Sequence, residues 1–114
     1  MILSVKQKER IAELKERIDY IDEIVLEKIS DHSQPLPLNL ILEARFNVLM
    51  ITGIKLEAEL KYLEEQGDED LEGVISVKRR RLDMIKGQIN ELNNVADMLN
   101  KYDSVGREFE IIRV

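Results

Sequence analysis

The chain has no cysteine and no tryptophan, and aromatic residues occupy only 4% of its 114 positions. The absence of cysteine excludes disulfides and thiolate metal sites and fits a reducing compartment. No segment holds the roughly 18 or more uncharged apolar residues that a membrane span needs. A short apolar run precedes the first charges, which is the reverse order of a signal peptide. We therefore expect a soluble, cytoplasmic chain with an aliphatic core.

Residues that carry catalytic chemistry are also scarce. His32 is the only histidine, and its neighbours Asp31 and Ser33 lie beside it in a predicted turn, where side chains adjacent in sequence rarely form a hydrogen-bonded triad. There is no Glu-x-x-His pair and no glycine loop of the phosphate-binding pattern. The sequence predicts no catalytic residue, no metal site and no cofactor, and we expect a protein that is not an enzyme.

What the chain does have is helical periodicity. Charged residues make up 35%, a bias typical of long helices and coiled coils, and the length fits one domain. Apolar residues recur at spacings of three and four in segments of about 4–30 and 71–102. The residues that follow this spacing are Ile11, Leu14, Ile18, Ile21 and Val25, then Leu82, Ile85, Ile89, Leu92, Ala96 and Leu99.

A third helix is predicted over about 38–66, between Pro37 and Gly67, and it is apolar on more than one face. Leu40, Met50 and Ile54 widen its apolar arc, so it must be covered on several sides. Gly53 occupies one of its apolar stripes. Either another helix passes close to this glycine, or the chain tolerates it with a slight bend beside Thr52.

These patterns predict an all-α fold in which three long helices form an antiparallel, coiled-coil-like hairpin or bundle over residues 1–103. Residues 104–114 form an extended C-terminal tail, with Phe109 and Ile111 on one face of a predicted strand. The two ends of an up-down-up bundle lie about 40 Å apart, too far for this strand to bridge. The tail therefore pairs with a second copy, adds to another protein's sheet edge, or stays unstructured.

An acidic segment between the second and third helices carries a pattern of oxygen ligands. Such side chains stand at positions one, three and five, glycine at six and an apolar residue at eight: Asp68, Asp70, Glu72, Gly73 and Ile75. This spacing resembles the calcium-binding loop of the EF-hand family, which implies a cation site. It departs from the family at position twelve, where Arg79 replaces the bidentate glutamate. The alternative is an acidic turn in which Asp70 caps the next helix.

A basic run follows this segment and is a candidate anion-binding site: Lys78, Arg79, Arg80 and Arg81. It could bind nucleic-acid phosphates or an acidic protein surface. Four successive residues spread around a helix, however, and the net charge of −6 disfavours a polyanion. The alternative is that these cations compensate the acidic turn and the acidic first helix.

The function that these observations favour is assembly. We expect an interaction protein that self-associates, most simply as a dimer, and contacts an unidentified protein through the middle helix or the tail. The predicted contact residues are Leu40, Phe46, Met50, Ile54, Phe109 and Ile111. The alternatives are a nucleic-acid-associated protein and a small acidic inhibitor, a type common among accessory proteins of phages and other mobile elements.

Overall fold

The computed structural model of the chain describes residues 3–31 and 37–103. It contains the helices α1 (Val5–Ser30), α2 (Leu38–Gln66) and α3 (Glu72–Asp103), with a short 3₁₀ turn, η1 (Glu69–Leu71), before α3. No strand occurs in these two ranges. The all-α prediction is confirmed, and each helix begins and ends within one residue of the predicted bounds. The predicted strand at residues 104–114, with Phe109 and Ile111, lies outside the described residues.

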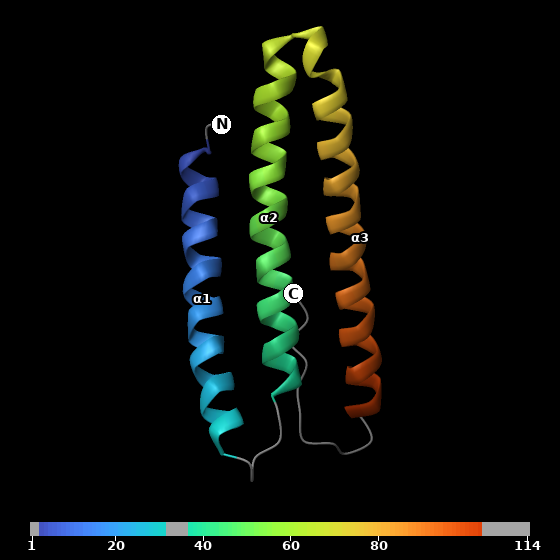
Figure 1. The fold of residues 1–114 in the computed structure, drawn as a ribbon. Helices are drawn as coiled ribbons and strands as arrows, with labels where there is room; N and C mark the ends of the chain where they lie inside the picture. Colours follow the sequence, from blue (N-terminus) through green and yellow to red (C-terminus); the bar gives the residue numbers. More distant parts are fainter. Residues whose placement is uncertain (1–2, 32–36, 104–114) are drawn as a thin grey trace.

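The three helices run up and down beside one another with α2 in the middle (Figure 1). Both extensive contacts between long helices involve α2, which packs against α1 on one side and against α3 on the other. This arrangement explains the apolar breadth of α2, because two of its faces are covered. It also makes α1 and α3 edge helices, each with an outer face turned away from α2.

Local sequence signals set the ends of the helices. Ser4 and Gln7 form a capping box at the start of α1: Ser4 Oγ accepts from the Gln7 backbone N–H at 3.1 Å, and Gln7 Oε1 accepts from the Ser4 N–H at 2.8 Å. Gly67 ends α2 in the left-handed conformation, with φ of 62°. After Gly67, Asp68 caps the 3₁₀ turn η1, and its carboxylate accepts from the Asp70 N–H at 2.9 Å. Asp70, the predicted cap of the third helix, lies within η1.

The core is divided between the two sides of α2. On the α3 side the buried cluster comprises Leu49, Leu56, Leu60, Leu82 and Ile85. On the α1 side it comprises Ile11, Leu14 and Ile51. The α1 and α3 members of these clusters belong to the seams predicted for those helices, so the spacing of three and four identified their inner faces correctly.

Gly53 marks the place where α3 crosses α2. A methyl group built on Gly53 would lie 3.8 Å from Ile85 Cγ2, an ordinary van der Waals distance. Another helix therefore does pass beside this glycine, as one of the two interpretations proposed. The contact leaves room for an alanine, so packing against α3 does not require glycine at this position.

Candidate interaction surfaces

The predicted contact residues on α2 fall into two groups. Phe46 is only 7% exposed and is part of the core, so its ring is not a surface for a partner in this conformation. Leu40, Met50 and Ile54 are half-buried. The periodicity marked all four as apolar but could not separate the residue that the chain covers from those it leaves partly open.

Met50 and Ile54 lie where the α1 and α3 sides of the molecule meet. Both pack against the cluster that α1 forms with Ile51. They also line a hollow of about 170 Å³ between α2 and α3, with Gly53, Leu82, Ile85 and Ile89 among its other residues. Helices flank Met50 and Ile54 on two sides and still leave them partly open to solvent. This hollow is the main candidate contact site on α2.

An ion pair borders the same hollow. Lys86 Nζ lies 3.9 Å from a carboxylate oxygen of Glu57, and both side chains are more than half exposed. An apolar floor with charged residues at its rim is the usual composition of a protein contact site. The exposed pair itself contributes little to folding stability.

A second apolar surface lies on one exposed flank of α3, about 100° around the helix from its inner seam, and is called the outer face of α3 below. Val74, Val77, Met84 and Met98 are 45–65% exposed. They lie along one heptad line, a row of residues spaced alternately three and four apart. This row starts at Val74, one residue before the inner seam of the same helix. The predicted contact residues did not include this outer line, because only the inner seam of the helix was recognised in the sequence. The signal that could have found it was the second apolar register on the same helix.

Two of the four residues of the basic run form ion pairs with α2, whose residues are all described, and two do not. Lys78 Nζ lies 2.5 Å from Glu59, and the Arg79 guanidinium donates to Glu64, so α2 carboxylates hold both cations. The compensating acids therefore belong to α2 and not to the acidic turn or α1. Within residues 3–31 and 37–103, no ion pair involves Arg80 or Arg81.

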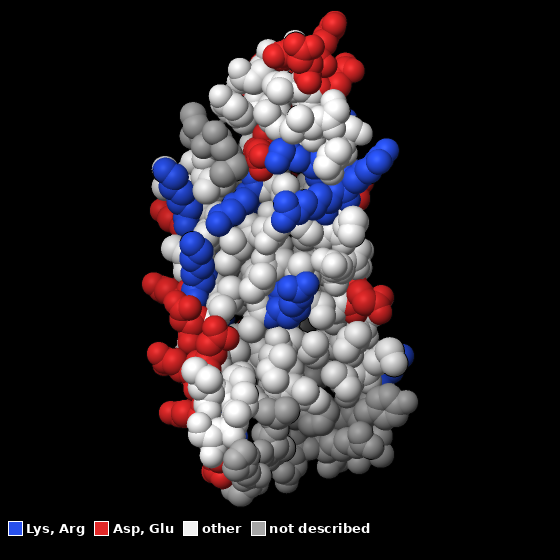
Figure 2. Space-filling view, in the orientation of Figure 1, with Lys and Arg blue, Asp and Glu red and all other residues white. Residues whose placement is uncertain are grey.

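Charge is unevenly spread over the face of the molecule seen in Figure 2. Lysine and arginine side chains form a band across its upper half, over all three helices. Acidic side chains gather at the lower left, over α1, and at the top, over the turn between α2 and α3.

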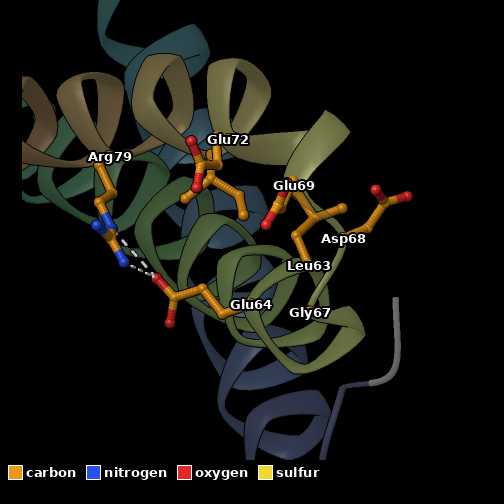
Figure 3. Close-up of a pocket in the computed structure, with 8 residues that line it drawn as sticks. Leu63, Glu64, Gly67, Asp68, Glu69, Glu72 and Arg79 are labelled. Carbon is orange, nitrogen blue, oxygen red and sulfur yellow. Dashed lines mark hydrogen bonds and ion pairs between the residues drawn. The ribbon is translucent and has the colours of Figure 1, made fainter.

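The acidic turn forms a shallow hollow rather than a chelating loop. The hollow is lined by the turn residues Asp68, Glu69 and Glu72 and by Glu64 of α2. In Figure 3 Asp68 points away from the others while Arg79 reaches Glu64. Glu72 and all that follows of the EF-hand-like pattern are helical, because α3 begins there. In the described part of the chain, no group of three or more acidic, histidine or cysteine side chains is arranged to hold a metal ion.

One partly buried ion pair fastens α1 to α2. Arg17 Nε donates to both carboxylate oxygens of Glu43, at 3.2 and 3.1 Å, and Nη2 donates to one of them at 2.9 Å. The Glu43 side chain is 13% exposed and that of Arg17 37%. The hydrogen bond to Glu43 raises the pKa of Arg17 above its usual value, against the smaller lowering effect of burial. The guanidinium also lies 5.2 Å from the centre of the Tyr20 ring.

The chain matches no protein-family model, no curated protein and no solved structure. None of the helices, within the ranges described, is both long and apolar enough to cross a membrane.

Proposed function

We propose that this chain is a non-enzymatic assembly protein that self-associates and contacts a partner protein through α2 or the C-terminal tail. The observation that carries the proposal is the partial burial of the Met50 and Ile54 side chains. Two helices flank these side chains, yet both remain half-buried in an apolar hollow. Among residues 3–31 and 37–103, α1 and α3 are the helices that pack against α2, and neither encloses these two side chains fully.

The size and lining of the hollow suit a side chain from another helix. A volume of about 170 Å³ admits one large aliphatic or aromatic group. Such a group inserted between α2 and α3 removes apolar surface from water at about 25 cal/mol per Å². Helix-in-groove recognition uses anchors of this kind, spaced along one face of the bound helix.

The test measures mass in solution and partner capture with matched variants. Sedimentation velocity of the intact chain, up to about 100 μM, is expected to show a concentration-dependent assembly. Met50→Glu and Ile54→Glu are expected to reduce capture of a partner protein from lysate. Val48→Glu is the control, because Val48 is an exposed α2 residue outside the hollow. A chain that stays monomeric and captures nothing, with or without the tail, contradicts the proposal.

The cationic band supports a second candidate, a nucleic-acid-associated protein. The band crosses all three helices on one face (Figure 2), and among the described residues Arg80 and Arg81 have no ion pair. This candidate predicts DNA or RNA binding that weakens steeply as salt is added. Arg80→Gln with Arg81→Gln is then expected to reduce the affinity several-fold. Failure to bind either nucleic acid at low salt removes this candidate.

A further inference from the structure

The outer face of α3 combines apolar ends with a charged centre. Val74 and Val77 lie near its start, Val95 and Met98 near its end, and all but the half-buried Val95 are exposed. Between them the same heptad line carries Arg81, Met84, Gln88 and Glu91. Because α3 is an edge helix of the layer, α2 covers only its inner face (Figure 1).

Arg81 and Glu91 carry opposite charges on this line but cannot pair with each other in one chain. Ten residues of helix separate them by about 15 Å along the axis. Both side chains are exposed, and in the described part of the chain neither makes an ion pair. In a second copy of the helix running in the opposite direction, each of these charges can lie opposite the other one.

We propose that the outer face of α3 binds the same face of a second copy of this chain, antiparallel, with the two-fold axis between Met84 and Gln88. These two residues stand at the midpoint between Arg81 and Glu91. In this register Arg81 faces the partner's Glu91, Val77 faces the partner's Val95, and Val74 faces the partner's Met98. The inference rests on the self-association in the proposed function and identifies its surface.

The charge pattern selects the antiparallel direction. A parallel pair in register would place Arg81 opposite the partner's Arg81, and Glu91 opposite the partner's Glu91, and both contacts are repulsive. Reversing one helix replaces them with two attractive contacts, because a two-fold axis repeats every contact. The same reversal brings the apolar start of each helix against the apolar end of the other.

Gly87, next to the axis, supports a close approach at the centre. A methyl group built on Gly87 would meet no atom within 4 Å, so the chain's own packing does not call for glycine there. Glycine in a helix interior costs about 1 kcal/mol relative to alanine. Beside the axis, the absence of a side chain lets the two α3 helices come closer together.

Charge reversal tests the pairing. Arg81→Glu alone and Glu91→Arg alone are each expected to weaken the dimer at least about tenfold, since each creates two like-charge contacts. An equimolar mixture of the two variants is expected to form a mixed dimer of wild-type affinity. Glu16→Arg, on the exposed outer face of α1, is the matched control and leaves the dimer unchanged. A mixture no tighter than the single variants overturns the proposal.

Cross-linking tests the direction, since the chain has no cysteine of its own. A mixture of Val77→Cys and Val95→Cys chains is expected to form a disulfide-linked dimer on mild oxidation. Each variant alone is not, because its two cysteines lie about 27 Å apart in an antiparallel pair. A cross-link with Val77→Cys alone shows the parallel direction and overturns the proposal.

The outcomes separate this inference from the proposed function. A wild-type chain that stays monomeric contradicts both the self-association and the α3 contact. A wild-type dimer that neither responds to charge reversal nor yields the mixed cross-link contradicts the α3 contact alone. In that case another surface holds the copies together and self-association stands.

Discussion

The two edge helices pack against α2 in the same way and differ on their outer faces. α1 and α3 both bury a seam with spacings of three and four. On α1 three of the four exposed apolar residues, Val5, Leu26 and Ile29, also share one heptad line, but the middle of that line is charged. It carries Lys8, Lys15, Asp19 and Asp22. The α3 line carries only Arg81 and Glu91 as charged residues and has the exposed Met84 near its centre. The inner faces therefore determine the fold, and the line on α3 is the more apolar of the two exposed lines.

The largest expected effect tests whether the two inner faces are equally important. Leu14 on α1 and Leu82 on α3 are 4% and 9% exposed. Leu14→Ala and Leu82→Ala are each expected to lower the free energy of unfolding by about 2–5 kcal/mol, through lost burial and a new cavity. Urea titration followed by circular dichroism measures both. A loss below about 1 kcal/mol for either would show that its helix is only loosely attached.

Breaking the ion pairs that join each edge helix to α2 is expected to have an intermediate effect on the free energy of unfolding. Glu43→Gln, which leaves Arg17 without its carboxylate partner, is expected to cost about 1 kcal/mol. Glu64→Gln, which removes the more exposed partner of Arg79, is expected to cost less than about 0.5 kcal/mol. Thermal unfolding measures both, and equal losses would contradict the assigned difference in burial.

The pH dependence of the Arg17 contribution follows from the direction of its pKa. The pKa is raised in the folded chain, so this stabilisation is complete below the unfolded value and is lost as pH rises through the folded one. That loss occurs only in strongly alkaline solution. The difference between wild type and Glu43→Gln is therefore expected to stay constant from about pH 6 to about pH 9.

Exchanging glycine and alanine at exposed positions of α1 and α3, which changes only helix propensity, is expected to have the smallest effect on stability. Gly87→Ala on α3 is expected to raise the stability of the monomer by up to about 1 kcal/mol, because the added methyl group meets open space. Ala12→Gly, on the exposed outer face of α1, is expected to lower it by a similar amount. Urea unfolding at low concentration measures both. A loss on Gly87→Ala would reveal a contact that the single chain does not make.

The sequence predicted the helices well because their ends carry local signals. The capping Ser4, the proline before α2 and the left-handed Gly67 act within a few residues of where they stand. The periodicity likewise identified the inner seams. It could not show that Phe46 is enclosed while Met50 stays half-buried, because the degree of cover depends on how far each neighbouring helix extends around α2.

The ionic partners were also beyond sequence reasoning. Lys78 and Arg79 pair with α2 residues that lie 19 and 15 positions earlier, across the turn at Gly67. Such partners follow from the register of two packed helices, which no local pattern sets. The outer line of α3 was present in the sequence but hidden beside the stronger inner seam.

The central position of α2 has a consequence for how the molecule opens. Its extensive contacts join only helices that are consecutive in the chain, so the contacts are local and folding is expected to be fast. Either edge helix can detach while the remaining pair stays packed. The amide hydrogens of α2 should consequently exchange with solvent last, after those of α1 and α3.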